Sequence, residues 1–160
     1  MTPMTTVIDH ALLDAVSAEA AASPRRRKNR NFHPHNDYPG HRLLNAIEPG
    51  SYVPPHRHLD PHKDETMIVV RGRLGLVIFN DAGDIIGQHD LTAAGPALGV
   101  DIPHGTWHSV LALEPGTVFL EAKSGPYALL EDAERASWAP GEDTPGAAAY
   151  LQKLATLFAA

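Results

Sequence analysis

Short apolar runs separated by turn-forming residues dominate the middle of the chain, from about residue 41 to residue 122. Runs rich in Val, Ile, Leu and Phe occupy positions 41–48, 66–70 and 74–79, and turn chemistry recurs roughly every eight to twelve residues. The loop at 80–84, with the sequence Asn-Asp-Ala-Gly-Asp, is typical of a connection between two hairpin strands. This pattern predicts an all-β domain built as an antiparallel β-barrel or jelly roll.

A helical period replaces this pattern at both ends of the chain. Residues 9–22 predict a helix whose N-cap is Asp9 and which Pro24 terminates. Residues 146–158 predict a second helix, capped by Thr144 with Pro145 at its first position. The side chains expected to face the core are Leu12, Leu13, Val16 and Ala20 in the first helix and Ala147, Leu151, Leu154 and Phe158 in the second.

Three parts of the chain follow from these patterns. Residues 25–42 contain prolines, a glycine and a polar run, which together argue against long regular structure. We therefore expect an N-terminal helix and irregular arm over 1–40, a barrel over 41–127, and a C-terminal extension with its helix over 128–160.

Composition narrows the class of protein. The 160 residues are 43% hydrophobic and 20% charged, which suits one folded domain. A net charge of −6 argues against nucleic acid as a partner, and the absence of cysteine excludes thiolate chemistry. The N-terminus does not have the pattern of a secretory signal, and no apolar stretch approaches the ~18 residues of a membrane span. We therefore expect a cytoplasmic protein.

Three histidines and one glutamate form a candidate metal site. His56 and His58 are two residues apart, so both imidazoles point the same way if the segment is extended. Glu65 begins the next apolar run, and His108 follows a turn at 103–105. Imidazole and carboxylate suit divalent Zn, Fe, Mn or Ni, and ligand type alone does not choose among these metals.

The spacing of these residues resembles the two signature motifs of the cupin superfamily. Gly50, five residues, His56-Arg-His58, six residues, Glu65, six residues and Gly72 match the first motif, with a longer gap than usual before Glu65. Pro103-His-Gly105-Thr-Trp-His108 matches the second motif, with Ala112 at a position that is often Asn. The longer gap leaves Asp60, His62 and Asp64 as possible substitutes for Glu65.

More narrowly, the chain resembles the WbuC-type cupin-fold metalloproteins over roughly residues 8–127. The residues that carry this resemblance are Ala22 to Arg27, Asn31 to His33, Ile47 to His58, Glu65 to Arg73, Ile102 to His108, and Leu113 to Thr117. The resemblance implies a cupin double-stranded β-helix with a metal inside, a homodimer, and an association with surface-polysaccharide (O-antigen) metabolism. It does not imply a specific reaction.

Other residues are candidates for ligand contacts. Tyr52 precedes His56 by four positions, His62 and Lys63 lie in the loop between the metal-binding candidates, and His33 precedes the barrel. Arg42 starts the first barrel strand and either reaches into the cavity or faces solvent. We expect the loop of His62 to be solvated unless it forms a rim around the ligand.

A basic cluster, Arg25, Arg26, Arg27, Lys28 and Arg30, stands out in an acidic chain. Its functional interpretation is a clamp for phosphate or a sugar nucleotide, because arginine forks match phosphate oxygens. Its simpler interpretation is a solvated run or a set of ion pairs with Asp and Glu, and this is favoured.

Four functions remain open. The leading one is a divalent-metal cupin that binds or acts on a small polar or sugar-type ligand, for example as a metal-dependent isomerase-like enzyme. The alternatives are an Fe(II)-dependent dioxygenase, a module that binds metal and ligand without turnover, and a metal-free sugar epimerase of cupin shape. The fold alone does not decide among them.

Overall fold

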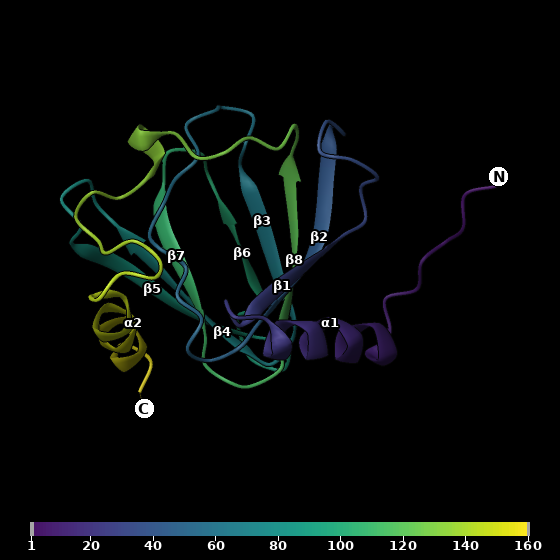
Figure 1. Ribbon diagram of the computed structural model, residues 1–160, viewed down its shortest axis with the longest axis horizontal. Coiled ribbons are helices and arrows are strands. Elements are labelled where there is room, and N and C mark those ends of the chain that lie inside the picture. Colours follow the sequence, from purple (N-terminus) through teal and green to yellow (C-terminus); the bar gives the residue numbers. More distant parts are fainter. Residues whose placement is uncertain (1, 160) are drawn as a thin grey trace.

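Two antiparallel sheets face each other across the core in the computed structural model, which describes residues 2–159 (Figure 1). The larger sheet has the order β1-β2-β8-β3-β6, and its strands are β1 (Arg27–Asn31), β2 (Gly40–Ile47), β8 (Thr117–Ser124), β3 (Glu65–Arg71) and β6 (Gly99–Ile102). The smaller sheet has the order β5-β4-β7, with β5 (Ile85–Thr92), β4 (Arg73–Phe79) and β7 (Trp107–Ala112). The predicted all-β jelly roll is confirmed.

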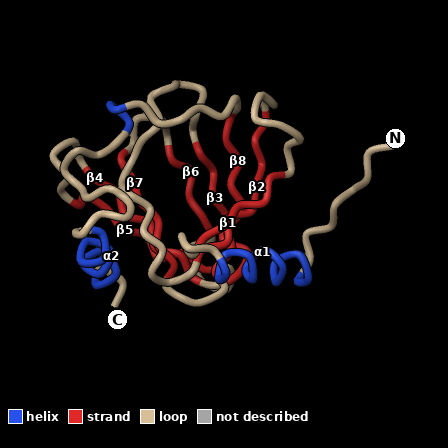
Figure 2. Tube along the Cα trace, in the orientation of Figure 1, coloured by secondary structure: helices blue, strands red, loops and turns tan. Residues whose placement is uncertain are grey.

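Two helices lie outside the strands, α1 (His10–Ala22) and α2 (Ala147–Thr156), and a short 3₁₀ turn, η1 (Asp132–Glu134), precedes α2 (Figure 2). The N-cap of α1 is Asp9 as predicted, and its carboxylate accepts a hydrogen bond from the Leu12 N–H at 2.9 Å. The predicted cap of the second helix is wrong, because Gly146 is the N-cap of α2. The Thr144 hydroxyl instead donates to the Gly141 carbonyl at 2.7 Å.

Three apolar clusters account for the packing. The first lies between the sheets and includes Leu74, Leu76 and Phe119. In the second, the stripe of α1 with Val16 packs against the outer face of the larger sheet, and in the third Leu154 of α2 packs beside the smaller sheet. Burial of apolar area is the main stabilising term here, and it leaves the helices outside the barrel interior.

The crossing from β3 to β4 requires a glycine. Gly72 has a φ of +80°, and a Cβ atom at this position would lie 2.4 Å from the Thr117 Oγ1 atom. Only glycine adopts this conformation without strain and leaves room for the neighbouring strand. The tight turn carries the chain from one sheet to the other.

The prediction of irregular backbone over 25–42 missed strand β1. Its sequence, Arg-Lys-Asn-Arg-Asn, has no apolar alternation, yet it pairs with β2 from Arg27 opposite Ile47 to Asn31 opposite Leu43. A polar strand is tolerated here because β1 is an edge strand beside a polar cavity. The larger sheet therefore includes residues from the predicted arm, while the proposed division of the chain into three parts stays a prediction.

Candidate metal centre

His56 and His108 face each other across a short antiparallel bridge. The backbone N–H of each residue donates to the carbonyl oxygen of the other, and both N···O distances are 3.0 Å. Directly paired residues of an antiparallel bridge place their side chains on the same side, and the two ring centroids are 4.6 Å apart. His108 belongs to β7, whereas His56 stands in the segment that follows Pro54 and Pro55.

Backbone carbonyls orient both of these rings. The Nδ1 atom of His56 lies 2.9 Å from the Pro54 carbonyl oxygen, and the Nδ1 atom of His108 lies 2.9 Å from the Thr106 carbonyl oxygen. A carbonyl oxygen only accepts, so Nδ1 carries the hydrogen in each neutral ring and Nε2 keeps its lone pair. Such contacts hold a histidine in the tautomer that binds metal through Nε2.

Glu65 lies between two of the imidazoles. Its Oε1 atom is 2.9 Å from the His58 Nε2 atom, and its Oε2 atom is 3.0 Å from the His108 Nε2 atom. These contacts have the distance of ion pairs but not the geometry of hydrogen bonds, so His58 Nε2, His108 Nε2 and Glu65 Oε2 are buried without a hydrogen bond. Buried polar atoms in folded proteins are nearly always satisfied, so these three atoms call for a partner.

The donor set fits a divalent transition metal in chemistry and burial, but not yet in its spatial arrangement. Among residues 2–159, no three His, Asp or Glu side chains have donor atoms placed to hold one ion as they stand. The Glu65 carboxylate occupies the space between His58 and His108, where the centroids of these two rings are 6.4 Å apart. Side-chain rotations would be needed to turn all donors to a common point.

Burial and neighbouring charge perturb the titration of these groups. Burial, with the nearby His108, lowers the pKa of His56 to about 3, so this ring is neutral at physiological pH. Burial alone would lower the pKa of His108, but the neighbouring Glu65 carboxylate outweighs this effect and raises the pKa of His108 above its usual value. Burial by itself would raise the pKa of Glu65. The contacts with His108 and His58 and the charge of Lys123 outweigh the effect of burial, so the pKa of Glu65 lies well below its usual range.

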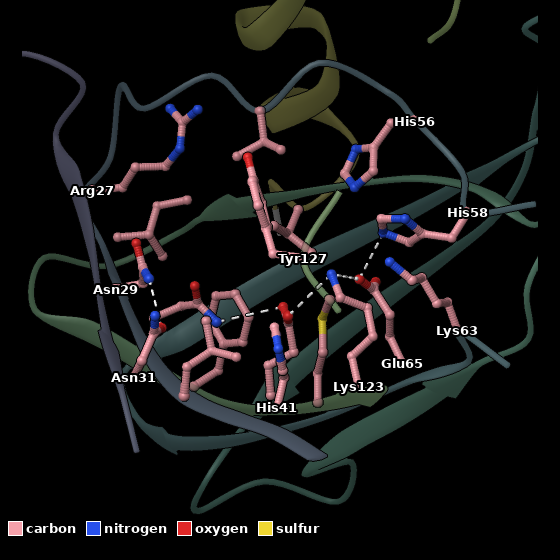
Figure 3. A pocket seen from close by; sticks show the side chains of 18 of the residues that line it. Arg27, Asn29, Asn31, His41, His56, His58, Lys63, Glu65, Lys123 and Tyr127 are labelled. Atoms are coloured by element: carbon pink, nitrogen blue, oxygen red, sulfur yellow. Dashed lines mark hydrogen bonds and ion pairs between the residues drawn. The ribbon is translucent and has the colours of Figure 1, made fainter. Parts of the chain in front are cut away.

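These side chains form one wall of a cavity of about 680 Å³. Strand register places Glu65, Lys123 and His41 in one row across β3, β8 and β2, and Glu121 in the next inward row. The Lys123 ammonium donates to Glu65 at 2.9 Å and lies 3.6 Å from Glu121. Figure 3 shows His56, His58 and Glu65 on one side of this cavity and Asn29 and Asn31 of β1 on the opposite side.

Of the five other candidate ligand contacts, Lys63 and His33 line the cavity. His33 is buried and stacks on His41 with ring centroids 3.8 Å apart. Tyr52 is buried elsewhere, and its hydroxyl donates to the Pro140 carbonyl at 2.7 Å. Arg42 is exposed and lies over the Tyr38 ring at 5.4 Å, outside the cavity lining.

The loop between the metal-binding candidates divides into exposed and buried residues. His62 has an 84% exposed side chain and pairs with Asp60, and Asp64 pairs with His104 at the surface. None of the substitutes for Glu65 therefore lies among the buried imidazoles. Lys63, by contrast, is buried and lines the cavity.

Part of the basic cluster forms ion pairs with acidic side chains. Arg25 and Arg27 both bind the Glu142 carboxylate at 2.8 Å, and Arg30 binds Glu19 at 2.7 Å. This arrangement agrees with the simpler interpretation of the cluster and ties the C-terminal extension to β1. Arg25, Arg27 and Lys28 of this cluster also line the cavity.

Sequence reasoning missed Glu121 and Lys123. They are the inward charged residues of β8, and burial together with the Glu65 charge raises the pKa of Glu121. Their spacing could have identified them, because two charged residues that are two positions apart at the end of an otherwise apolar strand lie on the same face of the sheet. Trp107 packs in the cluster beneath α2, with Arg57 over its ring at 4.3 Å.

Comparison with known proteins places the chain in a family. The family described as "Domain of unknown function (DUF6016)" matches residues 8–91. The chain belongs to this family. No curated protein matches the sequence significantly. None of the helices in residues 2–159 is both long and apolar enough to cross a membrane.

Solved structures share the fold of this DUF6016 protein. KdgF from Halomonas sp. is 21% identical with a TM-score of 0.51, over 66% of this chain and 84% of that one. A conserved protein of unknown function from Streptococcus pyogenes is 12% identical with a TM-score of 0.52, over 79% and 93% of the two chains. CapF, solved with the inhibitor 3-isopropenyl-tropolone, is 20% identical with a TM-score of 0.54, over 70% of this chain but 31% of that one. The chain therefore has the jelly-roll fold of the cupins.

Proposed function

We propose that His56, His58, Glu65 and His108 bind one divalent transition metal at the wall of a cavity that receives a small polar ligand. The observation that carries this proposal is the convergence of His58, His108 and Glu65, whose buried Nε2 and Oε2 atoms lie at ion-pair distance without forming a hydrogen bond. Three imidazoles and a carboxylate suit Zn, Fe, Mn or Ni, so the proposal keeps all four. A bound metal would coordinate these buried nitrogen and oxygen atoms.

The protein's own residues prepare the site in two ways. The carbonyls of Pro54 and Thr106 hold the rings of His56 and His108 with Nε2 free, and burial keeps His56 neutral. Lys123 stabilises the charge of the Glu65 carboxylate through its 2.9 Å contact. When bound, the metal supplies Lewis acidity toward a ligand carbonyl or hydroxyl group.

Glu121 and Lys123 favour an isomerase-like enzyme over a module that only binds. Glu121 lies on the inward face of β8, and Lys123 lies between it and Glu65. A carboxylate in this position is able to take a proton from a bound ligand and return it to a neighbouring carbon, the step that isomerisation of a hydroxy carbonyl compound requires. The Fe(II)-dependent dioxygenase remains the alternative, since it would use the same ligand set.

The biological setting of the proposal comes from sequence resemblance. The WbuC-type motifs favour a sugar-type ligand and a role in surface-polysaccharide metabolism, and they favour a homodimer. A cytoplasmic location belongs to the same proposal. Sedimentation analysis of the purified protein measures its oligomeric state directly.

Elemental analysis tests the metal proposal. The untagged protein and its His58→Ala and His62→Ala variants are compared by plasma mass spectrometry. We expect close to one metal per chain in the wild type and in His62→Ala, whose side chain is exposed, and a loss in His58→Ala. Equal metal in all three proteins, or none in any after reconstitution, would contradict the assignment. Bound Fe would favour oxygen chemistry, and bound Zn, Mn or Ni would favour proton transfer.

A further inference from the structure

Lys63 is a buried cation without a carboxylate partner. Its exposed fraction is 9%, and its ammonium donates to the Pro126 carbonyl oxygen at 2.7 Å. Among the ion pairs of residues 2–159, none involves this lysine. A buried ammonium needs a compensating negative charge, and a single carbonyl supplies only part of it. Figure 3 shows Lys63 beside His58 and Glu65, at the edge of the same cavity.

Most other charges of the cavity have a partner. Lys123 lies within ion-pair distance of Glu65 and Glu121, and Arg25 and Arg27 share Glu142. Lys28 also lines the cavity, but its side chain is exposed and water solvates its charge, unlike that of Lys63. With a divalent metal at the proposed site, the metal and the two lysines outweigh the two glutamates by two positive charges. An anionic ligand would balance part of this excess.

The opposite side of the cavity offers hydrogen bonds without charge. Asn29, Asn31 and Asn45 line it, and the Asn29 amide donates to the Asn31 side-chain oxygen at 2.8 Å. Side-chain amides both donate and accept, which suits hydroxyl groups. Adjacent strands lie about 4.8 Å apart, so β1 and β3, three strand spacings apart, are separated by roughly 14 Å. A ligand that reaches both sides is therefore larger than a simple carboxylate such as acetate.

We propose that Lys63 and the asparagines of β1 and β2 form a subsite for a polyhydroxylated carboxylate, a ligand of the sugar-acid class. Lys63 binds the carboxylate, and the asparagines bind hydroxyl groups. A carboxylate fits better than a phosphate, because Glu142 already engages the nearby arginine forks of Arg25 and Arg27, whose geometry matches phosphate oxygens. This inference rests on the proposed function, since it assigns the ligand of the same cavity.

Calorimetric titration of the full chain tests the subsite. The probes are glucuronate, glucose, glucose 6-phosphate and acetate, each titrated into metal-loaded and chelator-treated protein. We expect glucuronate to bind more tightly than the other three. The Lys63→Met variant should weaken glucuronate binding about tenfold or more and leave glucose binding unchanged, since a hydrogen bond to a charged group is lost. Lys63→Arg should retain the preference.

The control is Lys153→Met, which removes the same charge from the exposed face of α2 and should change nothing. Equal binding of glucose and glucuronate by the wild type, or no binding of either, would overturn the inference without any variant. Tighter binding of glucose 6-phosphate would reassign the anion to phosphate, and equal binding of acetate would remove the hydroxyl contacts. Glucuronate binding that depends on Lys63, in a wild type that takes up no metal on reconstitution, would refute the proposed metal site and leave the subsite standing.

Discussion

The inner face of the larger sheet has two ends of opposite character, although the same three strands build both. At one end, Ile47, Phe119 and Val69 pack against the smaller sheet and are nearly inaccessible to solvent. At the other end, strands β3 and β8 present Glu65 and Lys123 to the cavity. Apolar contacts at the first end stabilise the barrel, and this stability allows charged groups to remain buried at the second end.

The largest expected effect is a loss of stability at the apolar end. Leu76→Ala removes a side chain that is 1% exposed in the core between the sheets, and it should lower the free energy of unfolding by about 2–5 kcal/mol. Ile86→Ala is the matched control, because its side chain is 65% exposed and the change should stay within about 0.5 kcal/mol. Urea unfolding measures both. Equal effects would mean that burial between the sheets does not account for the stability of the barrel.

A smaller effect is expected from metal at the polar end. Added metal should raise the free energy of unfolding by about 2.7 kcal/mol when its free concentration is about a hundredfold above Kd. His108→Ala should abolish this increase, because it removes a buried candidate ligand, whereas Leu76→Ala should retain it. Thermal unfolding with and without metal provides the measurement. Loss of the increase in both variants would show that the two ends are not independent.

The smallest effect concerns the contact between the C-terminal extension and β1. Hydrogen bonds from Arg25 lower the pKa of Glu142 to about 2, with a further contribution from Arg27. A depressed pKa stabilises the fold above pH 4.5, the ordinary value for a glutamate, and this contribution disappears as the pH falls toward about 2. Glu142→Gln should therefore cost about 1 kcal/mol at pH 6 and progressively less below pH 4.5.

Urea midpoints at several pH values check this expectation. Glu114→Gln serves as the control because Glu114 is an exposed glutamate in a turn at the far end of β8. The difference in urea midpoint between Glu142→Gln and the wild type should become smaller as the pH falls. The difference in urea midpoint between Glu114→Gln and the wild type should not change with pH. A constant difference at all pH values would mean that the ion pairs do not account for the contribution of Glu142.

The sequence predicted the fold where local pattern and packing agree. Alternating apolar runs predicted strands β2, β3 and β4, and Asp9 with the stripe of α1 predicted the first helix. It missed β1 because no apolar period marks a polar edge strand, and it misplaced the cap of α2 because Thr144 bonds within its own turn. Both errors arise where a tertiary partner, and not the local sequence, decides the conformation.

The sequence predicted which residues form the candidate metal site. It did not predict how the charged side chains around that site are arranged in space. Spacing identified His56, His58, Glu65 and His108, and the structure places them around one wall of a cavity. Spacing could not show that Lys63 turns inward while its neighbour His62 faces solvent. The role of these residues as metal ligands stays a prediction until metal is measured.

By itself, the sequence determined an all-β barrel between two helices, an acidic chain without thiols, and a metal-type set of donor residues. Those properties follow from composition and from periods of two and about 3.6 residues, which are local. Only the tertiary structure decided that β8 places Lys123 opposite Glu65 and that β1 contributes asparagines to the cavity. Strand pairing joins residues far apart in the sequence, and their register depends on how the whole core packs.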